Sequence, residues 1–163
     1  MPSFHESRTV RRSSAEMFEL VADFERYPEF APFCLAAKIR RRSTEPSGIE
    51  TLIADMEVGY GSVRVKFATR DRLDRAKAAI SIFSIDGPFR YFEAHWSFRD
   101  VPQGGSRITF TTRYQFSNTA FDILLAPIFS RVVAGLARAF EKRALEADDG
   151  PGRVSKDRGP PPR

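Results

Sequence analysis

The stretch AFDILLAPIFSRVVAGLARAFEKRALEA, residues 120–147, decides the fold of this chain. Its apolar residues recur at three- and four-residue steps, which places side chains on one face of an α-helix: Phe121, Leu125, Ile128, Val132, Leu136 and Phe140. Leu124, Phe129 and Val133 make this face wider than a single neighbouring helix would cover. The stretch therefore predicts a long helix packed on a curved sheet, with a kink at Pro127 because proline removes a helical hydrogen bond.

Residues 36–117, which precede this helix, alternate between apolar and polar side chains with a period of two. The alternation is clear where Val63, Val65 and Phe67 face away from Arg64 and Lys66. Turn sequences divide the region into six strands, whereas residues 79–85 are apolar on both sides and leave their facing open. Six strands joined by short turns predict an antiparallel meander, whose apolar face needs the C-terminal helix as its cover.

The N-terminal part supplies one more strand and two short helical elements. Residues 4–10 alternate as a strand, and Ser13 with Glu16 forms a capping box that begins a helix. A helical turn is predicted to begin at Pro28 and to stop before Pro32. The predicted order is β-α-α-β6-α, an α+β domain over residues 1–147, followed by a disordered tail rich in Pro and Gly over residues 148–163.

The composition limits the kinds of partner that suit the chain. Fifteen phenylalanines among 163 residues favour either a thick core or an interior that holds an apolar guest. The net charge of +5 and the pI of about 9.7 favour anionic partners. A single cysteine, Cys34, excludes an internal disulfide and suits a reducing compartment. Since no signal peptide is visible and the apolar run 123–129 is short, we expect a cytoplasmic chain without a membrane span.

Few residues are suited to catalysis, so we expect a protein that is not an enzyme and has no catalytic residues. His5 and His95 fall on polar strand faces, and Cys34 lies in an apolar context. No phosphate-binding glycine loop or metal-ligand spacing occurs, so neither a metal nor a cofactor is expected. The polar side chains expected on inward faces are few: Tyr60, Thr69, Thr112 and Tyr114.

Several local motifs, combined with this order of elements, resemble the START-like helix-grip superfamily. They are VADFERYPEFAPFC at 21–34, GPF at 87–89, WSF at 96–98, YQFSN at 114–118, APIF at 126–129 and AFEKRA at 139–144. More narrowly, the chain resembles the coenzyme Q-binding START-domain proteins and the RatA ribosome-association toxins. Those families often have Leu-Pro-Trp-Cys where this chain has Ala31-Pro32-Phe33-Cys34, which predicts a differently shaped pocket mouth.

The resemblance implies a curved antiparallel sheet wrapped around the C-terminal helix, with an apolar ligand between them. It implies a polyprenyl quinone such as ubiquinone, bound as a ligand and not as a redox cofactor, by a carrier or chaperone that supports respiratory electron transport. The alternative it implies is a ribosome-associated regulator, a toxin that binds the large ribosomal subunit; DNA is not an expected partner. The predicted ligand-binding residues are Phe30, Phe33, Leu52, Met56, Val65, Phe67, Trp96, Phe110, Tyr114, Phe121, Leu125, Phe129 and Val133.

A run of basic residues on outward strand faces bears on the choice between these partners: Lys38, Arg40, Arg41, Arg42, Arg64, Lys66 and Arg70. Such a run attracts either anionic lipid or the phosphates of ribosomal RNA. Aromatic residues interleaved with the charges would favour RNA through base stacking, and none alternate with this run. The pattern favours peripheral contact with an anionic membrane surface, which for a cytoplasmic protein is the inner membrane.

Overall fold

The computed structural model describes residues 3–149, and its elements follow the predicted order. The first three are β1 (Ser3–Val10), α1 (Ser14–Ala22) and the 3-10 helix η1 (Phe24–Glu29). Six strands and one helix follow: β2 (Cys34–Thr44), β3 (Glu50–Tyr60), β4 (Val63–Asp74), β5 (Ala79–Asp86), β6 (Phe89–Asp100), β7 (Ser106–Phe116) and α2 (Thr119–Asp149). The predicted α+β arrangement is confirmed. Most of the predicted tail, residues 150–163, lies outside the described residues.

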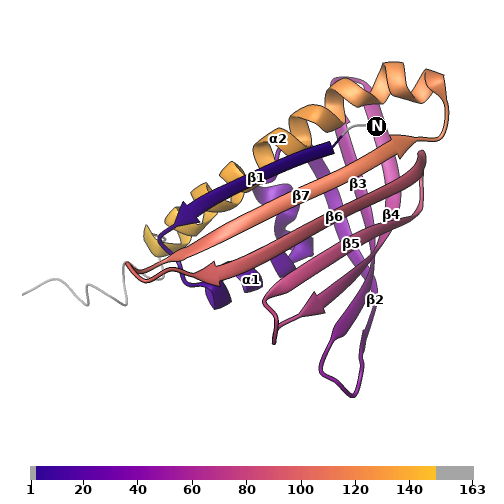
Figure 1. Ribbon diagram of the computed structural model, residues 1–163. Helices are drawn as coiled ribbons and strands as arrows, with labels where there is room; N and C mark the ends of the chain where they lie inside the picture. The colour runs from indigo at the N-terminus through magenta and orange to yellow at the C-terminus, as the bar shows by residue number, and fades with distance from the viewer. Residues whose placement is uncertain (1–2, 150–163) are drawn as a thin grey trace, which may run out of the picture.

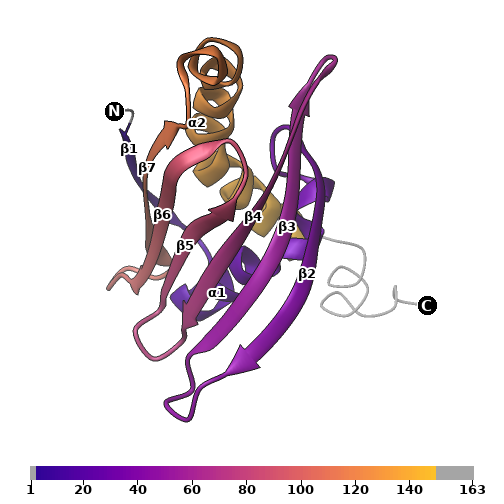
Figure 2. The same cartoon turned by 90° about the vertical axis from the view of Figure 1, so that its right-hand side faces the viewer.

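The seven strands form one antiparallel sheet in the order β1-β7-β6-β5-β4-β3-β2. The sheet curves around α2, with β1 and β7 along one side of the helix and β2 and β3 on the other (Figures 1 and 2). Register shifts in the β2–β3 and β4–β5 pairs add local bends, since a bulge increases twist. The helix-grip prediction is confirmed, because the inward faces of the strands are covered by α2 and by α1.

The predicted start of α1 is confirmed, whereas the predicted start of η1 is wrong. Ser13 caps α1 by accepting a hydrogen bond from the Glu16 backbone N–H, and the Glu16 carboxylate accepts one from the Ser13 N–H, as the capping box predicted. The turn predicted to begin at Pro28 begins four residues earlier, at Phe24. A 3-10 helix needs only hydrogen bonds from residue i+3 to residue i, and the bond from Arg26 N–H to the Asp23 carbonyl already forms one (3.2 Å).

Helix α2 continues through Pro127 and has one unburied end. Ile123 and Leu124 are 75% and 53% exposed, whereas Leu125 is buried. Length and composition alone would also let the segment Thr119–Glu146 cross a membrane, contrary to the expectation drawn from the short run 123–129. In this fold, however, its apolar face packs on the sheet, as core helices do.

Aromatic rings fill most of the space between helix and sheet. Phe140 of α2 is fully buried, with ring centroids 5.2 Å from Trp96 on β6, 5.2 Å from Tyr27 and 5.1 Å from Phe30. The sequence did not decide which side of β5 faces inward. In the structure Ile80 and Ile82 face the core and Phe83 is exposed. These contacts join α2, η1 and the sheet into one core.

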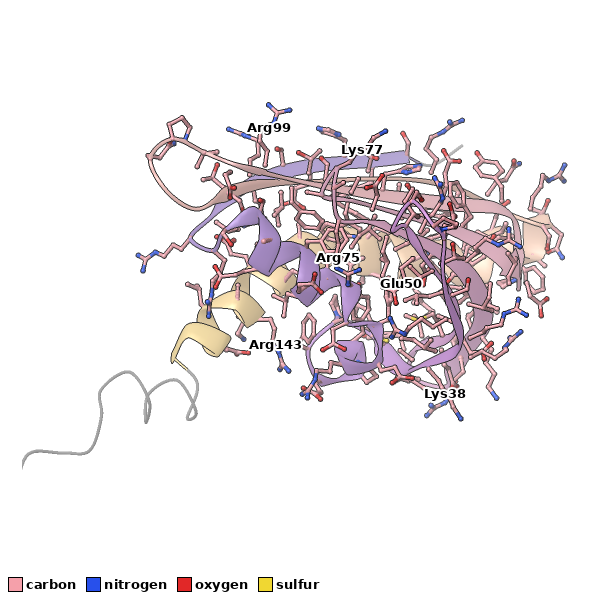
Figure 3. The ribbon with its side chains drawn as sticks, turned by 90° about the horizontal axis from the view of Figure 1, so that it is seen from below. Lys38, Glu50, Arg75, Lys77, Arg99 and Arg143 are labelled. Carbon is pink, nitrogen blue, oxygen red and sulfur yellow. The ribbon has the colours of Figure 1, made fainter. Side chains whose placement is uncertain are left out.

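One end of the core is closed by ion pairs. Glu50 is buried at the start of β3, and its carboxylate contacts Arg42 at 2.5 Å and Arg75 at 3.0 Å. Arg75 also pairs with Glu19 of α1 at 2.7 Å, and Figure 3 labels Glu50 and Arg75 close together in this region. Its two guanidinium partners lower the pKa of Glu50 despite the opposing effect of burial.

Candidate functional site

An apolar cavity lies between α2 and the concave face of the sheet, with η1 at one side. Its volume is about 80 Å³, and its walls come from every part of the fold except β1 and α1. The lining residues are Phe24, Tyr27, Ala31, Pro32, Cys34, Met56, Val58, Phe67, Thr69, Asp71, Ile82, Phe92, Ala94, Trp96, Phe110, Phe129, Val132, Val133 and Leu136. The interior is therefore a packed aromatic core that keeps one small space open.

Six of the thirteen predicted ligand-binding residues line this cavity: Met56, Phe67, Trp96, Phe110, Phe129 and Val133. Phe67 of β4 and Phe129 of α2 meet across it, with ring centroids 5.8 Å apart. Helix and sheet thus supply facing aromatic walls, as the sequence predicted. Whether these residues bind a ligand stays a prediction.

Four other predicted residues lie around the cavity without lining it. Leu52 is fully buried in β3, and Tyr114 of β7 packs on Phe92 with ring centroids 6.2 Å apart. Phe30 packs on Phe140 beneath the guanidinium of Arg143, and Phe33 packs on Tyr60 at the end of β3. These residues support the walls or cover the segment that precedes β2.

The last three predicted residues, Val65, Phe121 and Leu125, line a separate hollow near the first turns of α2. Arg64 and Lys66 stand at its edge, as do Gly87 and Pro88 from the β5–β6 turn. The exposed Leu124 also lines this hollow. The thirteen residues are therefore spread over two spaces and the packing between them.

The cavity holds one charged residue that the sequence analysis did not single out, Asp71 of β4. It is 1% exposed, and neither of its carboxylate oxygens has a hydrogen-bond partner. Burial raises the pKa of Asp71 to about 7, while the Thr69 hydroxyl opposes the shift without reaching hydrogen-bond geometry. The strand period contained the signal, because Asp71 continues the inward series of Val65, Phe67 and Thr69.

Two other polar side chains of the cavity, besides the Thr69 hydroxyl and the Trp96 indole N–H, are already engaged or are weak donors. The Tyr27 hydroxyl donates to the Val21 carbonyl, and burial raises its pKa well above the ordinary value. The Cys34 thiol lies 3.8 Å from the Ala36 carbonyl, and burial raises its pKa to about 11. A thiol with this pKa is neutral near pH 7 and is a poor nucleophile.

Of the residues considered for catalysis, Cys34 lines the cavity and the two histidines do not. His95 lies outside the lining, with its Nδ1 3.1 Å from the Ser81 hydroxyl. Tyr60, expected to face inward, is 54% exposed because it stands at the end of β3, where Arg131 covers its ring. Across residues 3–149, no three His, Cys, Asp or Glu side chains come close enough to hold a metal ion.

The predicted basic run is exposed at all seven positions. Arg40 pairs with Asp55 and Arg42 with Glu50, while Lys38, Arg41, Lys66 and Arg70 form no ion pair with any described residue. Figure 3 shows Lys38 on the opposite side of the molecule from Arg99, so the positive charge is not confined to one face. The charges on β2 also protect an edge strand against pairing with other chains.

The chain is similar in sequence to proteins of a known family. The family described as polyketide cyclase/dehydrase and lipid transport matches residues 10–141. The ribosome association toxin RatA of Pseudomonas aeruginosa is 30% identical over 131 residues, covering 80% of this chain and 86% of its own. The mitochondrial coenzyme Q-binding protein COQ10 of Dictyostelium discoideum is 24% identical over 132 residues, covering 80% of this chain and 63% of its own.

A solved structure confirms the architecture. A START superfamily protein from Mycobacterium smegmatis superposes with a TM-score of 0.72 at 17% identity, covering 89% of this chain and 98% of its own. At that identity the likeness concerns the fold alone. The helix-grip arrangement is therefore shared, whereas the aromatic cavity and Asp71 must be explained from this chain.

Proposed function

Because the chain belongs to the polyketide cyclase/dehydrase and lipid transport family, we propose that it binds a polyprenyl quinone between α2 and the sheet. Its role would be that of a carrier or chaperone supporting respiratory electron transport, not of an enzyme. The observation that carries this proposal is the aromatic cavity beneath α2, whose walls are almost entirely apolar. The similarity to a coenzyme Q-binding protein supports the choice of a quinone.

Uptake of such a ligand requires the cavity to expand. A volume of about 80 Å³ is well below the roughly 300–1,000 Å³ typical of pockets for larger ligands. The segment between η1 and β2 is suited to move, because Ala31 and Pro32 line the cavity while Phe33 has a φ of 61°. That backbone angle is strained for a bulky residue, so the segment stores energy that a second conformation would release.

Solvent extraction provides the direct test. We expect organic extraction of the purified protein, followed by mass spectrometry, to recover polyprenyl quinone. We also expect a short-chain quinone to quench the fluorescence of Trp96, the only tryptophan, because its ring lines the cavity. Repeated absence of quinone from the extract, together with no binding of added quinone, would refute the proposal.

A second candidate function is that of a ribosome-associated regulator, supported by the similarity to RatA and by the unpaired cations of β2. Binding to ribosomal RNA would weaken steeply with salt, since each phosphate contact releases counterions. We expect Lys38→Glu with Arg41→Glu to reduce co-sedimentation with large ribosomal subunits at moderate salt. Lys77→Glu with Arg99→Glu, which changes the charge equally on the side opposite Lys38 in Figure 3, is the matched control. A wild-type chain that does not co-sediment would exclude this candidate.

Both candidates place the protein in the cytoplasm, and the quinone carrier would also contact the inner membrane from that side. The exposed Leu124 lines a hollow together with Arg64 and Lys66, and the exposed Ile123 precedes it in α2. Apolar side chains next to cations suit a surface of anionic lipid. We therefore place the membrane contact at the first turns of α2.

A further inference from the structure

Asp71 occupies a position where a carboxyl group destabilises the fold unless something pairs with it. Its neighbours across the strands are Leu52 of β3 and Ile82 of β5, both apolar. Its two oxygens are buried without a hydrogen-bond partner in the wall of the cavity. A buried carboxyl with no partner costs several kcal/mol in its charged form, so such a residue needs an explanation.

The residues around the cavity do not supply a partner for this carboxyl. The titratable groups that face it are Tyr27 of η1 and Cys34 of β2, and α2 contributes only Phe129, Val132, Val133 and Leu136. None of the lining residues is basic, and Arg42 and Arg75 are engaged by Glu50. Asp71 is thus kept apart from the ion-pair cluster that closes this end of the sheet.

These surroundings determine which form the carboxyl takes. An apolar cavity favours the neutral acid, which has an O–H donor as well as an acceptor oxygen. The Tyr27 hydroxyl is already bonded to the Val21 carbonyl, so the O–H of Asp71 is available to an incoming molecule, together with the Thr69 hydroxyl and the Trp96 indole N–H. Of these three donors, only the carboxyl loses its proton near neutral pH. A donor inside an apolar wall binds an uncharged molecule that carries an acceptor oxygen.

We propose that Asp71 is the polar anchor of the cavity, donating a hydrogen bond from its neutral carboxyl to a carbonyl oxygen of an uncharged apolar ligand. This inference rests on the proposed ligand-binding function and adds the chemistry of recognition: an acceptor oxygen and no negative charge. Ionisation of Asp71 removes the donor and places a negative charge beside the ligand oxygen. Affinity therefore falls as the pH rises.

The test uses the full chain, a decyl-substituted benzoquinone and decylbenzene, which has the same tail but no carbonyl. Binding is followed through Trp96 fluorescence between about pH 5.5 and 8.5, a range that spans the carboxyl's ionisation. We expect the wild-type affinity for the quinone to fall by about tenfold per pH unit above pH 7. Decylbenzene binding should not change with pH.

Two variants separate the donor from the charge. Asp71→Asn keeps a donor that cannot ionise, so quinone affinity should become independent of pH. Asp71→Leu removes the donor and keeps the number and branching of the side-chain heavy atoms, and at pH 6 we expect about tenfold weaker quinone binding with decylbenzene binding retained or improved. Asp55→Asn on the neighbouring strand, an exposed partner of Arg40, is the control for loss of a carboxylate.

The outcomes distinguish this inference from the proposed function. If Asp71→Leu binds the quinone as tightly as the wild type at pH 6, Asp71 is not the anchor, although the protein still binds quinone. If the wild-type affinity for the quinone does not fall between pH 5.5 and 8.5 while the affinity for decylamine, added as a cationic probe, rises, the carboxylate binds cations and the inference is wrong. If neither the quinone nor decylbenzene binds to any folded variant, the proposed function fails and the anchor fails with it. Circular dichroism of each variant verifies folding.

Discussion

Phe67 of β4 and Phe129 of α2 face each other across the cavity with ring centroids 5.8 Å apart and planes inclined at 58°. Phe129 also contacts Phe89 at 5.1 Å and Phe116 at 5.5 Å, so one helical side chain connects three strands. This ring holds the N-terminal half of α2 on the sheet and limits the size of the cavity. Replacing Phe129 with a smaller residue should therefore lower the stability of the fold and enlarge the cavity.

We expect Phe129→Leu to lower the free energy of unfolding by about 1–2 kcal/mol, because a buried ring is lost and the cavity grows. The added space should strengthen binding of the decyl benzoquinone, since less rearrangement is needed for uptake. Urea denaturation and Trp96 fluorescence measure the two effects. Ile123→Ala, at an exposed position of the same helix, is the control and should change stability by less than about 0.5 kcal/mol. Weaker binding by Phe129→Leu would contradict the prediction.

The pH dependence of stability provides a second prediction that needs no ligand. The pKa of Asp71 is about 7 in the folded chain and near 3.8 in the unfolded chain. Below pH 3.8 both states are protonated; as the pH rises towards 7 only the unfolded state releases its proton, so stability falls. Each unit of difference between the two pKa values corresponds to about 1.4 kcal/mol, so the free energy of unfolding should be lower by roughly 4 kcal/mol at pH 8 than at low pH.

Asp71→Asn cannot ionise and so does not lose stability as the pH rises. The free energy of unfolding of this variant minus that of the wild type should therefore increase between pH 4 and pH 8. The difference isolates Asp71, because Glu16, Glu50 and Asp55 have lowered pKa values that act in the opposite direction in both proteins. Urea denaturation at several pH values measures it. A difference that stays constant over this range would mean that Asp71 ionises normally in the folded chain.

The β6–β7 turn allows a prediction with a neighbouring control. Gly104 and Gly105 both have positive φ, 98° and 81°, so an alanine at either position is strained. A Cβ at Gly105 would also lie 2.1 Å from the Val10 carbonyl oxygen, whereas nothing lies within 4 Å at Gly104. We expect Gly105→Ala to lower the free energy of unfolding by at least about 2 kcal/mol more than Gly104→Ala does. Equal losses in thermal or urea denaturation would show that the end of β1 is free to shift.

The exposed end of α2 leads to a prediction about membranes. Replacing Ile123 and Leu124 with Glu should reduce binding to vesicles containing anionic lipid by about tenfold or more, because apolar contact is lost and repulsion is added. Leu145→Glu, an exposed apolar position near the other end of the helix, is the control and should bind like the wild type. Co-sedimentation with vesicles measures the effect, and equal loss in both variants would place the contact elsewhere.

The architecture follows from the order and periodicity of the chain. A period of two over residues 36–117 and a helical period over 120–147 require a sheet and a helix that cover each other, and the structure has this arrangement. The start of η1 was missed because a 3-10 turn leaves little periodic signal. The inward facing of Tyr60 was wrong because β3 ends at that residue and its ring lies outside the sheet.

The candidate site depended much more on tertiary structure. Sequence periodicity put Met56, Phe67, Trp96 and Phe129 on inward faces, because facing is a local property of a strand or helix. Whether inward side chains leave a space depends on how their volumes fit together, and that is settled only when all the elements pack. The alternation along β4 likewise predicts that Asp71 faces inward. The absence of a hydrogen-bond partner for Asp71 could not be predicted from the sequence. Such partners come from residues distant in the sequence, and only the fold decides which of them lie close enough.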